Sequence, residues 1–318
     1  MAKYKHEFWR FDSIPSISLL TVDLIRCAPH VHKEIELCYF FEGEGEVICR
    51  NTRCRIHRGD HVLFPPRAVH EVYSINQGQP VRLMRLKLSQ GFFQSVYPDM
   101  VNLDFLDPCP GANADEPLRL RIEALFLQLA RHYYLQEPYY QFECLSTTAQ
   151  LLRCLLENYS WRIVPESARH SMQVREERID QILTYVSSHY NERISLESIP
   201  LKEKLSKSYL SHFIRDQLSM NFQEYVSICR CEGALHLLIS EPKRPLTDIA
   251  LASGFQDTRQ MSKAFASRYG YSPKEYKERL LNNTDHRPDF YRPDTRYDEF
   301  YLKHKVAAEY ICAFTPGR

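Results

Sequence analysis

The first third of the chain alternates short apolar segments with turn residues. Breaks such as Glu42–Gly45, Arg58–Asp60 and Pro65–Pro66 separate the segments. Segments of this length at this spacing are typical of an all-β barrel or sandwich. We therefore predict strands over residues 17–26, 35–41, 46–49, 61–64, 69–73 and 81–88.

The period of the apolar positions changes in the middle of the chain. Apolar side chains recur at helical spacing along residues 117–160, with a break near Glu137–Pro138. This pattern predicts two amphipathic helices. The polar stretch Val164–His170 that follows them is typical of a linker.

The next hundred residues are densely helical and contain two units of similar layout. In the second unit we predict a short helix over 248–252 that Thr247 caps, a left-handed turn at Gly254, and a helix from about 258 to Tyr269 that Gly270 ends. A short helix, a glycine turn and a helix with a polar, basic face are typical of a helix-turn-helix. The second helix of such a motif enters the major groove of DNA.

The first unit follows the same order with weaker signals. Its leading segment is predicted at 195–199 and its second helix at 208–218. A longer helix over 222–240 has an apolar stripe that can pack against both units. The two units are therefore expected to share one helical domain.

Composition limits the cellular location and the partners that the chain is expected to have. The formal net charge is only +1, so the overall charge does not indicate a nucleic-acid partner. No apolar run approaches the roughly 18–20 residues that span a bilayer, and the residues after Met1 lack the apolar core of a signal peptide. Ten cysteines are scattered without a C-x-x-C pair, which predicts mostly reduced thiols. We expect a cytoplasmic protein.

A long gapped motif crosses the helical half and is most complete near its end, with Ile249, Ala250, Gly254, Phe255, Asp257, Phe265, Gly270, Ser272, Pro273 and Tyr276. It resembles the AraC/XylS family of bacterial transcription regulators. The resemblance implies that the two units bind successive major-groove faces of double-stranded DNA. It implies that the groove-facing residues are Ser208, Ser211, His212, Thr258, Arg259, Ser262 and Lys263.

Side-chain chemistry agrees with part of this assignment. Arg259 and Lys263 can donate to guanine O6 and N7. Other basic residues are better suited to phosphates; they are Lys207, Arg215, Arg268 and Lys274. The alternative is that these side chains only form solvated helix faces.

The first unit departs from the family pattern. Pro200 stands inside its leading helix, where proline removes a hydrogen bond and costs on the order of 3 kcal/mol. Glu203, Lys204 and Ser219 replace typical apolar and glycine positions. We therefore predict that the second unit supplies most of the specificity and that the first is weak or locally rearranged.

The N-terminal half contains two spaced motifs, one from His30 through His32 and Glu36 to Gly43 and one from Gly59 to His70. They resemble the two motifs of the cupin barrel. In metal-binding cupins the ligands match His30, His32, Glu36 and His70. The second motif departs from the pattern, with Arg67 in place of glycine.

Three interpretations of the barrel stay open. It can hold a small polar ligand, for example a sugar, without a cofactor; it can bind a transition metal; or it can be only structural. Candidate ligand contacts are His30, His32, Glu36 and His70, and Tyr39 and Tyr73 are candidates for stacking on a sugar.

The fold class is therefore a multi-domain α and β protein. We predict a cupin-like sensor barrel at 1–110, a helical dimerisation element at 111–165, a DNA-binding domain with two helix-turn-helix units at 166–281, and a tail of unassigned role at 282–318. An exposed apolar seam with Leu145, Leu152 and Leu155 would suit antiparallel pairing with a second subunit. The alternative is that these leucines pack on the barrel of their own chain.

The function that follows is a sequence-specific, ligand-controlled transcription regulator without catalytic residues. Its expected partners are double-stranded DNA, a small-molecule effector and a second copy of the chain, with RNA polymerase as a further candidate and no membrane. One alternative is a metal-dependent cupin enzyme fused to a DNA-binding module, and another is a regulator that senses no ligand.

Overall fold

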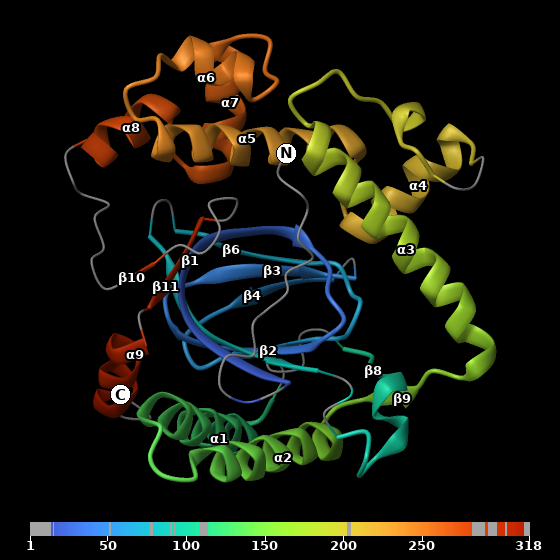
Figure 1. The fold of residues 1–318 in the computed structure, drawn as a ribbon, viewed down its shortest axis with the longest axis vertical. Coiled ribbons are helices and arrows are strands. Elements are labelled where there is room, and N and C mark those ends of the chain that lie inside the picture. The colour runs from blue at the N-terminus through green and yellow to red at the C-terminus, as the bar shows by residue number, and fades with distance from the viewer. Residues whose placement is uncertain are drawn as a thin grey trace.

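The computed structural model describes residues 14, 16–50, 52–76, 79–89, 91, 93–107, 114–201, 205–281, 290–291, 298–302 and 304–314. Figure 1 shows a β-barrel at the centre, a helix pair on one side of it and the helical half of the chain on the other. Within the described residues, no helix is long and apolar enough to cross a membrane.

Seven antiparallel strands make the barrel in the order β4-β3-β6-β1-β7-β2-β5. Each predicted segment forms a strand, so the β interpretation of the N-terminal half is confirmed. The strands are β1 (Ile17–His30), β2 (Ile35–Glu42), β3 (Gly45–Cys49), β4 (Thr52–Ile56), β5 (His61–Phe64), β6 (His70–Ser74) and β7 (Val81–Leu88).

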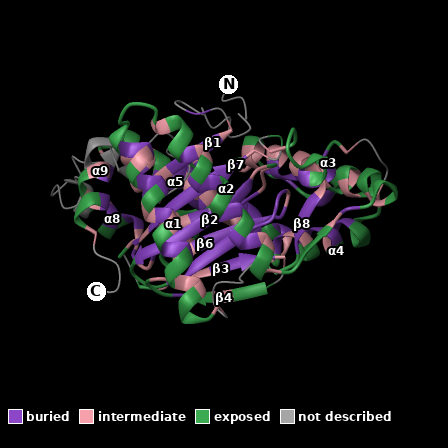
Figure 2. Cartoon of the chain, turned by 90° about the horizontal axis from the view of Figure 1, so that it is seen from below, coloured by how far each residue is buried: buried purple, intermediate pink, exposed green. Residues whose placement is uncertain are grey.

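The barrel strands are buried on both faces, which explains their nearly continuous apolar pattern. Side chains such as Cys38, Phe40 and Leu83 fill the interior. Their neighbours Leu37 and Tyr39 belong to a second core on the outer face. In Figure 2 the barrel strands are mostly purple, whereas the edge strand β4 is largely exposed.

Helices α1 (Glu116–Leu135) and α2 (Tyr140–Asn158) cover this outer face. Leu152 and Leu155 are buried there, and Leu145 packs against the same core. The expectation that these leucines form an exposed seam is therefore wrong, because the barrel itself covers them. The exposed apolar side chains of the pair and its connecting loop are Leu120, Leu135, Tyr139 and Phe142.

The prediction of a linker at Val164–His170 is also wrong for most of these residues. A short ladder joins β8 (Leu103–Phe105) to β9 (Trp161–Ile163), after the 3-10 turn η1 (Pro98–Asn102). Helix α3 then begins at Glu166 and continues to His189. Polar residues fill its first turns because one side of the helix faces solvent.

The helical half continues as a series of short helices. A 3-10 turn, η3 (Leu196–Ser198), precedes α4 (Lys207–Leu218), and α5 (Phe222–Ser240) connects the two units. The second unit contains α6 (Leu246–Ala252), α7 (Thr258–Tyr269) and α8 (Pro273–Leu281).

The tail beyond residue 281 returns to the barrel. Strand β11 (Asp298–Leu302) pairs antiparallel with β1 and with β10 (Phe290–Tyr291). Helix α9 (His304–Ala313) then packs its Ala307 and Ile311 into the core that α1 and α2 share with the barrel. The described parts of the tail are therefore an element of the barrel domain.

Seven of the ten cysteines are buried free thiols, and Cys312 is an exposed one. The expectation of mostly reduced cysteines is confirmed for these residues, whereas Cys54 is disulfide-bonded.

Candidate DNA-binding and effector sites

The second helix-turn-helix unit has the turn chemistry that its sequence predicts. Gly254 has φ +80°, and a Cβ there would lie 2.7 Å from the carbonyl oxygen of Tyr190. Asp257 caps α7 by accepting the Gln260 N–H at 2.7 Å, and Gly270 ends the helix with φ 79°. One detail was wrong: α6 begins after Pro245, and Thr247 makes no capping hydrogen bond.

Helix α7 separates an apolar side from a polar side. Met261, Phe265 and Tyr269 are buried in the core of the second unit. Arg259 and Lys263 are exposed, and Thr258 and Ser262 are half-buried. These four residues are placed where DNA could reach them, and their contact with bases stays a prediction.

The second helix of the first unit, α4, is equally well formed. Ser206 caps it by accepting the Tyr209 N–H at 3.2 Å. Its inward residues, Leu210, Phe213 and Ile214, are buried as predicted. Its proposed DNA-facing residues are exposed or half-buried; they are Ser208, Ser211, His212 and Arg215.

The leading segment of the first unit is rearranged, as Pro200 predicts. The described residues between Tyr190 and Leu201 contain only the single turn η3, and Ile199 after it is extended. A residue before proline is driven away from the helical region, and proline cannot donate a helical hydrogen bond.

The predicted barrel residues do converge. His30 at the end of β1, His32 after it, Glu36 on β2 and His70 on β6 each place a ligand atom within 4.8 Å of the others. His32 Nε2 lies 2.9 Å from Glu36 Oε2, and the His70 ring stacks on Phe64. The sequence therefore identified a real cluster of side chains.

Two buried cations that the sequence did not indicate complete this cluster. Lys87 Nζ lies 3.3 Å from Glu36 Oε2, and Arg85 Nε lies 3.5 Å from Glu36 Oε1. Lys87 is directly opposite Glu36 in the β2–β7 register. Burial alone would raise the pKa of Glu36, but Lys87 and Arg85 hold it well below its usual range.

Lys87 and Arg85 bear on whether a transition metal could bind among His30, His32, Glu36 and His70. The four donors are close enough to share an ion, but Glu36 already has two cationic neighbours in a buried setting. A divalent ion would bring further positive charge against Lys87 and Arg85 with one carboxylate to balance all three. The cluster therefore does not fit a metal while both cations are in place.

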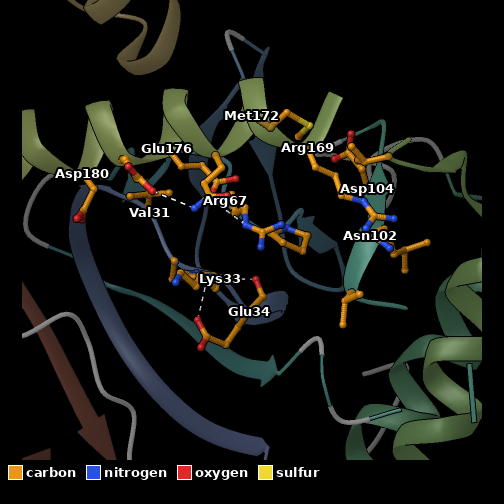
Figure 3. A pocket seen from close by; sticks show the side chains of 17 residues that line it. Val31, Lys33, Glu34, Arg67, Asn102, Asp104, Arg169, Met172, Glu176 and Asp180 are labelled. Atoms are coloured by element: carbon orange, nitrogen blue, oxygen red, sulfur yellow. Dashed lines mark hydrogen bonds and ion pairs between the residues drawn. The ribbon is translucent and has the colours of Figure 1, made fainter. Parts of the chain in front are cut away.

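A cavity of about 820 Å³ lies outside this cluster, between the rim of the barrel and α3. Figure 3 shows Asp180, Glu176, Met172 and Arg169 in succession along α3, with Glu176 paired to Arg67 of the barrel. His32 is the one member of the predicted ligand set that lines this cavity. Because 300–1,000 Å³ is the usual range for small-molecule sites, its size suits an effector.

The tyrosines suggested for sugar stacking have other roles. Tyr39 is 1% exposed and packs between Phe41 and Phe126 on the outer face of the barrel. Tyr73 donates to Glu46 and lies under the Arg26 guanidinium. Neither residue lines the cavity.

Ion pairs join the barrel to the helical half of the chain at two places, one on α3 and one on α7. Arg67, whose φ is +65°, places its Nε 3.0 Å from Glu176 on α3. On the other side, Arg268 of α7 lies 2.9 Å from Glu232 on α5 and 3.9 Å from Glu71 on β6. Arg268 is therefore not placed for a phosphate contact as expected, because it is buried against the barrel.

Comparisons with known proteins agree with this architecture. An AraC-like ligand binding domain matches residues 20–152, and a helix-turn-helix domain matches residues 202–279. The Msm operon regulatory protein of Streptococcus mutans is 28% identical over 134 residues, which are 42% of this chain and 46% of that protein. The melibiose operon regulatory protein of Escherichia coli K12 is 20% identical over 264 residues, 79% of this chain and 85% of its own length.

Among solved structures, fatty-acid-bound ToxT from Vibrio cholerae is 14% identical and aligns over 83% of this chain and 95% of its own, with a TM-score of 0.42. A ligand-binding barrel domain joined to paired helix-turn-helix units defines a ligand-responsive transcription regulator. The chain combines an AraC-like ligand binding domain with a helix-turn-helix domain and is similar to regulators of bacterial operons.

Proposed function

We propose that this regulator binds a specific DNA site chiefly through α7. The observation that carries the proposal is the exposed face of α7, where Arg259 and Lys263 lie opposite a fully packed side. Each good base contact is worth about 1–3 kcal/mol. The rearranged first unit then contributes less to specificity.

The test is a gel-shift titration of the full chain against its operator, located by footprinting upstream of its own gene and neighbouring operons. An Arg259→Ala, Lys263→Ala double variant should lose specific binding by roughly 2–6 kcal/mol. Arg53→Ala and Arg55→Ala, on the exposed edge strand β4, remove the same charge as a control. Unchanged operator affinity in the α7 variant would refute the assignment.

We propose further that a small polar effector controls DNA binding and that the protein carries out no reaction. One of its relatives is named as the regulator of the melibiose operon, which supports a sugar as the effector class. The charge of the Glu36 cluster supports a barrel that works without a metal cofactor. Stoichiometric metal in the purified protein, lost in His70→Ala, would favour the enzyme alternative instead.

The remaining partners also belong to the proposal. The regulator acts in the cytoplasm, where DNA is accessible, and forms a homodimer through the α1–α2 pair. Phe142 is 69% exposed and Tyr139 is 77% exposed there, which supports an interface on that side. RNA polymerase is the partner expected of a DNA-bound activator. Analytical ultracentrifugation of Phe142→Ser against wild type tests the dimer.

A further inference from the structure

We propose that the effector is a neutral polyhydroxylated molecule, of the size of a small sugar, that binds in the cavity between the barrel rim and α3. The inference rests on the proposed effector control and moves the ligand from the barrel interior to the boundary between the two domains.

The cluster around Glu36 inside the barrel is too buried to be the binding site of this ligand. Glu36, His70 and Lys87 are each 1% exposed and lie among one another and the apolar interior of the barrel. The cavity outside them has about 820 Å³. His32 connects the two places, because it lines the cavity and its Nε2 reaches Glu36 at 2.9 Å.

One face of α3 forms a whole wall of the cavity. The lining positions recur every three or four residues, so they project to the same side of the helix. The wall consists of Arg169, Met172, Gln173, Glu176, Glu177 and Asp180. The barrel supplies the opposite wall from the His32–Glu34 loop, Arg67, residues 101–104 at the start of β8, and Val164 after β9.

The chemistry of the walls selects the ligand class. Lys33, Arg67 and Arg169 offer donors, whereas four carboxylates offer acceptors; they are Glu34, Glu176, Glu177 and Asp180. Glu176 already pairs with Arg67, and a fifth carboxylate, Asp104, is held by Arg50 and Arg162. Hydroxyl groups both donate and accept, so a polyol can use both kinds of side chain. An anion would meet the acidic excess, particularly along α3.

Apolar side chains between the charges complete this match. Val31, Val101, Val164 and Met172 also line the cavity and can contact the C–H faces of a sugar ring. The backbone supports the polar groups, because the Arg67 N–H donates to the His32 carbonyl at 2.7 Å and fixes the loop that carries Arg67. A left-handed arginine is a costly conformation that is found mostly where the side chain has a required position.

The position of the cavity also explains how a ligand would reach the DNA-binding half. The N-terminal part of α3 lines the cavity, and its C-terminal part supplies Ile182, Leu183 and Val186 to the core of the first unit. A ligand bound between the barrel and α3 favours the arrangement in which both walls are close. The orientation of the first unit is then linked to ligand occupancy through one continuous helix.

The experiment is isothermal titration calorimetry of the full chain against glucose, melibiose and raffinose, with oleate and putrescine as charged probes. At least one neutral sugar should bind. Met172→Trp, which places a bulkier side chain in the wall of the cavity, should weaken that binding at least about tenfold. Ser171→Trp, on the exposed side of the same helix, is the matched control and should bind like wild type.

Equal sugar affinity in wild type and Met172→Trp would place the site elsewhere and overturn the proposal. Binding of oleate or putrescine in place of the sugars, or of no probe at all, would overturn the ligand class. Gel shifts on the same protein preparations report operator binding separately. The two experiments therefore distinguish a wrong ligand site from a wrong assignment of DNA binding.

Discussion

The two helix-turn-helix units meet the same barrel by different means. The second unit places Arg268 beside Glu71, which is 2% exposed and also accepts from Arg26 at 2.8 Å. The first unit contacts the barrel through Val69, which is buried in the core of that unit, and through α3, where Arg67 and Glu176 are 35% and 22% exposed beside an open cavity. The second unit meets the barrel through buried charge, whereas the first meets it through a buried valine and an ion pair beside the cavity. We infer that one unit is specialised for DNA contact and the other for response.

The largest expected effect compares the two anchors directly. Glu71→Gln leaves Arg26 and Arg268 without their shared carboxylate in a buried setting, so unfolding free energy should fall by about 3 kcal/mol. Glu176→Gln breaks a partly hydrated pair and should cost less than about 1 kcal/mol. Urea unfolding of the two variants measures both. Equal costs would contradict the distinction between the anchors.

The second prediction concerns the left-handed turn at Gly254 in the second unit. Gly254→Val should destabilise this unit by at least about 2 kcal/mol, since the left-handed backbone alone costs an ordinary residue roughly 1–2 kcal/mol. Its Cβ would also meet the backbone of Asn191 at 2.7 Å. Operator binding should be lost in gel shifts. Gly91→Ala, whose nearest neighbour is 3.9 Å away, is the control and should bind normally.

The third prediction ranks the recognition helices. Lys263→Ala on α7 should reduce operator affinity about tenfold, the equivalent of roughly 1.4 kcal/mol for one lost base contact. His212→Ala on α4 should reduce it by less than threefold if the first unit contributes little. Fluorescence anisotropy with a labelled operator gives both constants. A larger loss for His212→Ala would reverse the assigned roles.

The smallest effect is expected at Arg67. Glycine accepts a φ of +65° without strain, so Arg67→Gly should be more stable than Arg67→Ala by about 1 kcal/mol. Both variants lose the pair with Glu176 and differ only in backbone preference. Thermal unfolding compares them. Identical stabilities would mean that the left-handed conformation is not a source of strain at this position.

Much of this architecture was predictable because its signals are local. The strands of the barrel, the convergence of His30, His32, Glu36 and His70, and the turn at Gly254 follow from spacing, motif resemblance and glycine conformation. Pro200 likewise predicted the rearranged first unit, because its effect on the backbone needs no tertiary context.

The features that sequence reasoning missed depend on distant contacts. Lys87 lies on β7, a strand with apolar residues on both of its faces. The local sequence therefore did not show that the Lys87 side chain points at Glu36. Arg268 was assigned to phosphate because the sequence does not reveal which side of α7 meets the barrel. The cavity beside α3 was hidden for the same reason, since Val164–His170 resembles a linker but begins a helix that forms a wall.

The return of the chain to the barrel has a mechanical consequence. The helical half leaves the barrel domain after β9 and rejoins it where β11 pairs with Val22–Arg26 of β1. In topological terms the DNA-binding half is an insertion, attached at two points instead of one. Any reorientation must keep both attachments, which favours rotation about the line between them over free swinging. Two attachments also limit the conformational entropy that DNA binding must overcome, because the units explore fewer orientations before they meet their site.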